Sequence, residues 1–218
     1  MSLTSKARGL TLAGIMAFGV IAPRADAAAK DEGPWSVAAA PILSIHPAGE
    51  SGEPYLSEPL AGSTLGLAFV LQRHLSPSTA IALEVSSSLA LTDEQTGRFI
   101  FGPACYTPGC PTPVTSTHRD TIANLLASLT LGNAEVKAGP GVARSRTHQG
   151  DDKFNHYDQT NFLVTAGLDL VLPIGRRFSL VPTARYHFVF RGDERLYGGL
   201  SRSVVRLGVG VRFREASR

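Results

Sequence analysis

The sequence predicts an all-β fold: an eight-stranded antiparallel up-and-down β-barrel that spans a membrane. Three observations predict it. Apolar and polar residues alternate with a period of two, eight segments carry this alternation, and the linkers between them are alternately short and long. The composition agrees, because the 218 residues include 22 Gly and 14 Pro and only 18% are charged, which excludes a helical bundle and a charge-driven disordered chain. No uninterrupted apolar run long enough for a membrane-spanning helix follows position 25.

The first 27 residues are predicted to be a secretory signal peptide. Lys6 and Arg8 precede an apolar run over residues 10–22, and Ala25-Asp26-Ala27 has the small residues of a cleavage site. Cleavage after Ala27 would leave residues 28–218 as a single barrel domain and lower the net charge from +3 to +1. Such a domain has no basic surface for nucleic acid, so nucleic-acid binding is excluded.

The strands are predicted in order from their alternation. The first, at about residues 34–43, is the weakest. The next six lie at residues 64–72, 81–86, 121–131, 135–144, 162–172 and 178–190. The last, residues 204–213, is the clearest: its alternate positions from Val205 to Phe213 are apolar, while Arg206 and Arg212 lie on the other face. A helical period would scatter these arginines into the apolar stripe, so the segment is a strand.

The linkers indicate how the strands are connected. Residues 74–78, 132–133 and 173–177 are short enough for tight turns, whereas the linkers at about 44–62, 91–119, 145–160 and 191–202 are long. A membrane barrel has this asymmetry, with short turns and both termini on the periplasmic side and long loops outside the cell.

The mixed-polar face of each strand is predicted to point into the barrel, because an arginine facing lipid at the bilayer midplane costs about 2–4 kcal/mol. A soluble barrel with an apolar lumen would need the reverse arrangement, and its apolar exterior would aggregate in water. The predicted lumen charges, which should pair with one another, are Glu84, Glu135, Lys137, Asp169, Arg185, Arg206 and Arg212.

The aromatic residues are predicted to form two interfacial girdles. Trp35, Phe178 and Phe213 fall at the turn end of their strands. Phe162, Phe188 and Phe190 fall at the opposite end.

With this pattern over essentially the whole of residues 28–218, the chain resembles the small outer-membrane β-barrel proteins of the OmpA/OmpX type. The segment from Leu207 to Phe213 looks like the C-terminal strand that the barrel-assembly machinery recognises in that family, although here residues 214–218 follow the aromatic residue. The resemblance implies a location in the bacterial outer membrane and contact with its lipid and lipopolysaccharide. We also expect a monomer.

Cys105 and Cys110, the only two cysteines, are predicted to form a disulfide in the second long linker. No catalytic, cofactor-binding or metal-binding residues are predicted. His148, Asp151, Asp152, His156 and Asp158 in the third linker have no defined metal-site spacing. His187 faces inward and the residue two positions later is Val189, so the His/Ser pair of lipid A deacylases is missing and a structural histidine is favoured.

The function predicted from the sequence is therefore structural and non-enzymatic: an anchored barrel whose extracellular loops serve adhesion or envelope integrity and could contact an extracellular ligand. Two alternatives stay open. One is an outer-membrane lipid-modifying enzyme similar to a lipid A deacylase. The other is a small-solute pore, which is disfavoured because eight strands leave little free lumen.

Overall fold

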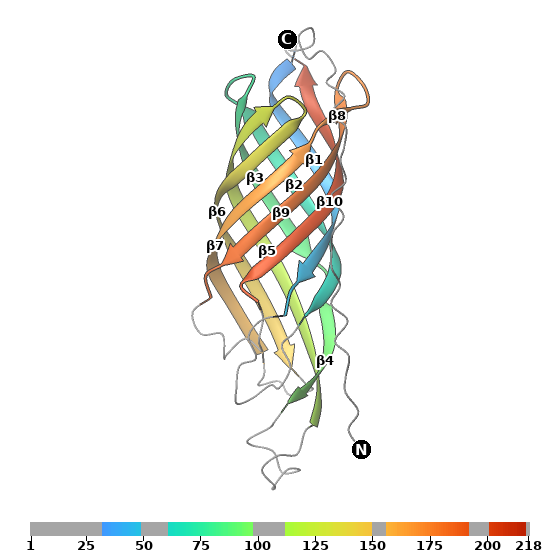
Figure 1. The fold of residues 1–218 in the computed structure, drawn as a ribbon, viewed down its shortest axis with the longest axis vertical. Helices are drawn as coiled ribbons and strands as arrows, with labels where there is room; N and C mark the ends of the chain where they lie inside the picture. Colours follow the sequence, from blue (N-terminus) through green and yellow to red (C-terminus); the bar gives the residue numbers. More distant parts are fainter. Residues whose placement is uncertain (1–31, 49–60, 98–111, 150–155, 192–200, 217–218) are drawn as a thin grey trace, which may run out of the picture.

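The computed structural model describes residues 32–48, 61–97, 112–149, 156–191 and 201–216, which form a single all-β barrel (Figure 1). Ten strands are present in the described residues: β1 (Glu32–His46), β2 (Gly62–His74), β3 (Thr79–Ser88), β4 (Leu91–Gly97), β5 (Thr112–Leu131), β6 (Ala134–Gln149), β7 (His156–Leu170), β8 (Leu172–Pro173), β9 (Phe178–Val189) and β10 (Ser203–Ala216). This region contains no helix long and apolar enough to cross a membrane.

The barrel is closed and has eight positions around its circumference. The antiparallel order is β10-β1-β2-β3-β5-β6-β7-β9, and pairing of β10 with β9 completes the ring. β4 continues the position of β3 along β5, and β8 continues that of β7 along β9. The first and last strands meet in a regular ladder in which, for example, Val37 pairs with Phe213. The predicted closed eight-stranded antiparallel barrel is confirmed.

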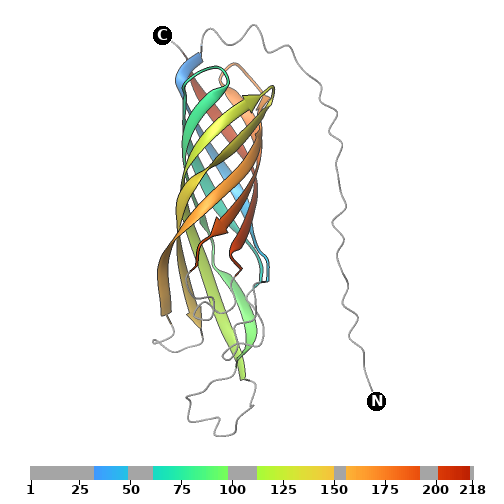
Figure 2. The ribbon, with the colours of Figure 1, turned by 60° about the vertical axis from the view of Figure 1, so that its left-hand side comes forward.

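Short turns close one end of the barrel (Figure 2). The tightest joins β5 to β6 through Gly132 and Asn133, where Gly132 has a φ of +63°. A two-residue hairpin that matches the strand twist requires a positive φ at its first central position, which glycine adopts without strain. The ends of β1 and β10 lie at this same end of the barrel.

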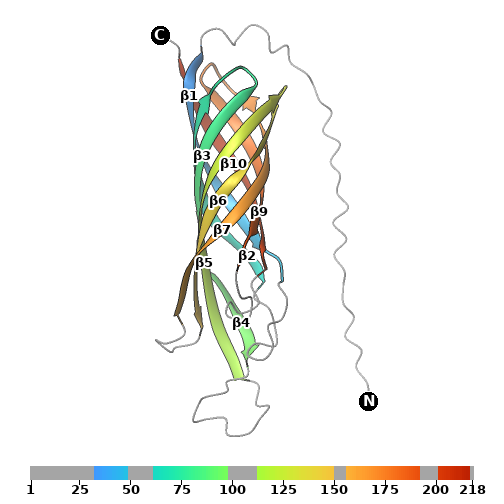
Figure 3. The same cartoon turned by 90° about the vertical axis from the view of Figure 1, so that its left-hand side faces the viewer.

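At the opposite end the strands extend further than the sequence predicted. β4 pairs with β5 from Leu91↔His118 to Gly97↔Thr112, and the two project past the other strands (Figure 3). β6 and β7 stay paired up to His148↔His156. The predicted long linkers at 91–119 and 145–160 therefore contain long strand segments, because the period-two alternation continues there with Thr and Arg outside in place of Leu and Val.

The exterior of the barrel is an apolar belt. Large side chains such as Leu67, Phe69, Leu83 and Leu125 are each between 49% and 59% exposed, while their strand neighbours point into the lumen. Beyond the belt, toward the projecting end, the outward positions of β5 and β6 are occupied by Thr121, Arg119, Arg144 and Arg146. A band of this kind is stable in lipid and would aggregate in water.

Candidate functional site

The lumen of the barrel, rather than a surface cleft, gathers the ionisable side chains. All seven charges predicted to face inward do so, and each is at most 5% exposed. Six of them, together with Gln72 of β2, form one connected cluster in the half nearer the turns, which we call the ionic plug: Gln72, Glu84, Glu135, Lys137, Asp169, Arg185 and Arg212.

Asp169 of β7 lies at the centre of the plug. Its carboxylate accepts from Arg185 Nη1 at 2.5 Å and from Arg185 Nη2 at 3.3 Å. It also lies 2.8 Å from Lys137 Nζ and 3.4 Å from Arg212 Nη2. One carboxylate therefore contacts three cations that come from β6, β9 and β10. Gly167 makes room for this arrangement, since a Cβ added there would lie 2.5 Å from Arg185 Cδ.

The remaining plug contacts balance the other charges. Arg212 donates two hydrogen bonds to Glu135, at 2.6 and 2.9 Å, in a bidentate pair. Arg185 donates from Nε to Glu84 Oε2 at 2.9 Å across the lumen. Lys137 also donates to Gln72 Oε1 at 2.9 Å. The plug thus contains three carboxylates and three cations, so its formal charge is zero.

A small cavity of about 30 Å³ lies beside the plug, and Glu84, Arg185, Arg206 and Arg212 are among the residues that line it. A space of this size holds only one or two water molecules. The plug therefore fills the section of the lumen that a small-solute pore would have to keep open.

Arg206 differs from the other six predicted lumen charges. It donates from Nη1 to Ser86 Oγ and forms no ion pair among the described residues. His187 lies on the neighbouring strand, fully buried, with its Nδ1 2.8 Å from Thr165 Oγ1, which in turn donates to Asn124. This histidine therefore faces the lumen, and its ring contacts the Thr165 hydroxyl.

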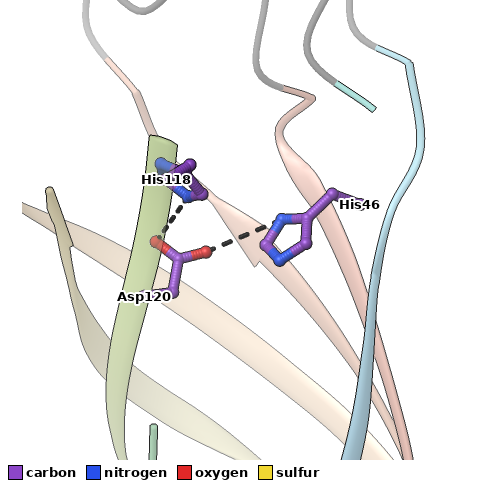
Figure 4. Close-up of side chains that lie close together, drawn as sticks. All are labelled: His46, His118 and Asp120. Atoms are coloured by element: carbon purple, nitrogen blue, oxygen red, sulfur yellow. Dashed lines mark ion pairs between the residues drawn. The ribbon is translucent and has the colours of Figure 1, made fainter. Parts of the chain in front are cut away.

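Three further ionisable residues meet inside the barrel at the projecting end (Figure 4). His46 ends β1, and His118 and Asp120 lie two residues apart on β5. His118 Nε2 lies 3.0 Å from Asp120 Oδ1, and His46 Nδ1 lies 3.8 Å from Asp120 Oδ2. The two imidazole rings are edge to face, with centroids 5.4 Å apart. All three side chains are at most 3% exposed, and we call them the mouth cluster.

The mouth cluster is not apparent in the sequence because two predicted strands are too short. The first is predicted to stop near residue 43 and the fourth to begin at residue 121, and these bounds place His46, His118 and Asp120 in loops. The missing signal is the inward series Asn124, Ile122, Asp120, His118, which continues the period of two without a break.

The six predicted girdle aromatics occupy the two ends of the belt. Near the turns, Phe178 packs against Phe213 with ring centroids 5.4 Å apart, and the Arg73 guanidinium lies 5.6 Å from the Trp35 ring centroid. Near the projecting end, Phe190 packs against Phe162 and Phe188, with centroids 5.5 and 5.2 Å away. Rings at these two levels mark the boundaries of the lipid-facing band.

An arginine patch lies on the outer surface directly above the second girdle. Arg119 and Arg146 are cross-strand partners on β5 and β6, and Arg144 is the partner of Thr121. Arg144 donates two hydrogen bonds to Asp158, at 2.9 and 2.6 Å, and Arg146 Nε donates to the same carboxylate at 3.3 Å. The hydrogen bonds from Arg144 lower the pKa of the exposed Asp158 carboxyl to about 2.

The arginine patch borders a surface hollow. This hollow has a volume of about 190 Å³ and is lined by Arg119, Thr121, Arg144 and Arg146. Cys105 and Cys110, and the predicted signal peptide at residues 1–27, lie outside the described residues.

Comparison with solved structures finds the same fold in several bacterial proteins. The chain is 11% identical to Ail, the attachment invasion locus protein of Yersinia pestis, with a TM-score of 0.51 over 84% of this chain and 99% of that one. It is 10% identical to Neisserial surface protein A, with a TM-score of 0.50 over 84% and 97% of the two chains. OprG, an outer membrane protein of Pseudomonas aeruginosa, is 12% identical, with a TM-score of 0.51 over the same shares. No family model and no curated protein sequence matches the chain.

The fold, the apolar belt and the two girdles are together those of a small outer-membrane β-barrel protein of bacteria. This agrees with the architecture and the outer-membrane location that the sequence predicted.

Proposed function

We propose that the chain is a structural, non-enzymatic outer-membrane barrel that supports envelope integrity by binding the phosphate groups of lipopolysaccharide at its arginine patch. The observation that carries this proposal is the direct pairing of Arg119 with Arg146 across β5 and β6. Like charges placed opposite one another in a sheet destabilise it. An anion bound between them would remove that repulsion.

The position of the patch fits the phosphates of the outer leaflet. Val142 and Phe162 are partners at the upper edge of the belt, and Arg144 lies two residues further along β6. Two residues of strand advance about 7 Å, which places the guanidinium groups just above the acyl chains. Two of the three arginines, Arg144 and Arg146, share the single carboxylate of Asp158, so the patch keeps a net positive charge. Arginine binds phosphate bidentately and is suited to this contact.

The ionic plug supports a structural role over a pore. Its charges pair across the lumen, and the space beside it is about 30 Å³. We expect purified protein to give no stable current in a planar bilayer, and large stable currents would contradict the proposal.

Lipopolysaccharide binding tests the proposal directly. The folded chain in detergent is titrated with lipopolysaccharide and with the same material after phosphatase treatment. We expect at least tenfold tighter binding of the phosphorylated form, weakening as salt rises. Changing Arg119, Arg144 and Arg146 together to Gln should remove this preference, whereas the control Arg176→Gln/Arg177→Gln, in an exposed turn at the other end, should keep it.

Two results would overturn the proposal. One is equal binding of both lipid forms by the unaltered chain. The other is the release of fatty acid from lipopolysaccharide, which would identify a lipid-modifying enzyme instead.

A further inference from the structure

We propose that His46, His118 and Asp120 bind one Zn²⁺ ion inside the barrel, at the end from which β4 and β5 project. The mouth cluster offers two imidazole nitrogens and one carboxylate oxygen, all within 4.8 Å of one another. Each side chain is buried, at 1–3% exposure, and the three lie close together (Figure 4). This inference is independent of the arginine patch, which lies on the outer surface.

The separations bring the three side chains within reach of one metal ion. Tetrahedral zinc with bonds of about 2.0–2.1 Å places neighbouring ligand atoms about 3.3 Å apart. His118 Nε2 lies 3.0 Å from Asp120 Oδ1, His46 Nδ1 lies 3.8 Å from Asp120 Oδ2, and one ligand atom from each residue lies within 4.8 Å of the others. Binding therefore requires the side chains to close around the ion, and His46, at the end of its strand, has to move toward β5.

Polar neighbours already hold two of the three ligands in place. The Nδ1 atom of His118 lies 2.9 Å from Thr147 Oγ1. Donation from Nδ1 to that hydroxyl leaves the lone pair of Nε2 directed at the cluster, as in most histidine metal ligands. Ser145 Oγ donates to Asp120 Oδ1 at 2.6 Å, which fixes the carboxylate.

The cluster also contains buried atoms that no hydrogen bond satisfies. His46 Nε2 and Asp120 Oδ2 have no hydrogen-bond partner among the described residues, and His118 Nε2 has only the Asp120 carboxylate, at 3.0 Å. Buried polar atoms of this kind destabilise a protein unless they are paired. A metal ion would engage the His118 nitrogen and the carboxylate directly.

The donor set and the nearby charges define the ion. Two imidazoles and one carboxylate suit zinc, whereas Ca²⁺ and Mg²⁺ require more oxygen ligands. Three protein ligands leave a fourth position open. Arg191 and Arg206 are buried cations whose charges act on His46, so they favour an anion at that position and weaken binding of the metal. We therefore expect micromolar affinity, well short of a closed structural zinc site.

Zinc bound here would connect strands that do not touch. β1 and β5 are separated around the barrel by β2 and β3. The ion would therefore fasten the wall across the lumen, above the lipid-facing belt, and stabilise the end of the barrel that lacks the ionic plug.

The test uses the purified, folded full chain in detergent after chelator treatment. Zn²⁺ is titrated by calorimetry, and Co²⁺ is used as a spectroscopic probe. We expect one Zn²⁺ per chain, the intense visible bands of four-coordinate Co²⁺, and no binding of Ca²⁺ or Mg²⁺. Asp120→Asn and His46→Gln should each weaken zinc binding at least 100-fold and abolish the cobalt bands.

His74→Gln is the matched control, because His74 lies in the lumen wall at the opposite end and should leave zinc affinity within twofold. Heat-dependent gel mobility shows which variants are folded, and two independent cluster variants keep the test valid if one of them fails to fold. Absence of zinc binding by the folded chain would overturn the proposal. Undiminished binding in the folded cluster variants would also overturn it, since the ion would then lie elsewhere.

Discussion

Replacing Asp169 with Asn tests whether the ionic plug holds the barrel together. The substitution keeps the size and shape of the side chain and removes one negative charge. Asp169 lies 2.5 Å from Arg185, 2.8 Å from Lys137 and 3.4 Å from Arg212. After the change, three buried cations share two carboxylates, Glu84 and Glu135.

The expected loss is large because the uncompensated charge stays buried. Removing one partner of a buried ion pair costs about 3–5 kcal/mol, much of it from the charge left behind. A second change, Lys137→Met, restores charge balance in the plug and should return about 1–2 kcal/mol of the free energy of unfolding. A recovery of this kind, from deleting a further ion-pairing group, is what distinguishes charge imbalance from simple loss of contacts.

Urea unfolding in lipid vesicles measures both variants. Trp35, the only tryptophan, reports the transition from the lipid interface. The exposed pair provides the control, since Asp158→Asn should lower the free energy of unfolding much less than Asp169→Asn does. A loss below about 1 kcal/mol in Asp169→Asn, or a further loss on adding Lys137→Met, would refute this account of the plug.

Three further predictions concern the lipid face, the surface and a linker. Leu83→Arg, on the belt, should lower the free energy of unfolding in vesicles by about 2–4 kcal/mol, whereas Leu75→Arg, in a turn, should lower it little. Equal losses in the two variants would mean that the belt does not face lipid. Carbon-detected NMR should show Asp158 titrating near pH 2, so its ion pair is intact above about pH 4 and is lost as the pH falls through 2; Arg144→Gln should move the titration up toward the ordinary 3.8. Mass spectrometry should find the two cysteines joined, and free thiols in exported protein would contradict that prediction.

Most of the fold can be predicted from the sequence because the interactions that determine the strands and turns are local. Alternation of residues such as Val205, Arg206 and Leu207 reflects the two faces of one strand, and short turns such as Gly132-Asn133 fix which strands are neighbours. Closure then follows, since an open apolar sheet would leave strand edges unpaired in lipid. The inward direction of the charges can also be predicted, because a charged side chain that faces lipid is costly.

The alternation of apolar and polar residues does not predict which side chains meet across the lumen. Alternation predicts that Asp169 and Arg206 point inward, but the partner of each depends on the tilt and stagger of strands far apart in sequence. Asp169 thus meets three cations while Arg206 meets only a serine. The mouth cluster was missed for a different reason, because outward arginines above the belt end the apolar signal although the strands continue.

The two polar clusters of the lumen should stabilise the barrel independently. Asp169 and Asp120 share none of the contacts described above, and the plug balances its own charge while the mouth cluster leaves buried atoms without hydrogen bonds. Asp169→Asn should therefore destabilise the barrel equally with and without Zn²⁺, whereas Asp120→Asn should cost more stability in the presence of Zn²⁺ than in its absence. Effects at separate sites without common partners add, so the double variant in zinc should show the sum of the two losses. Both variants are measured in saturating Zn²⁺. If the double variant is then as stable as Asp169→Asn alone, the loss of Asp120 has no separate effect, and zinc stabilises the barrel only through the plug.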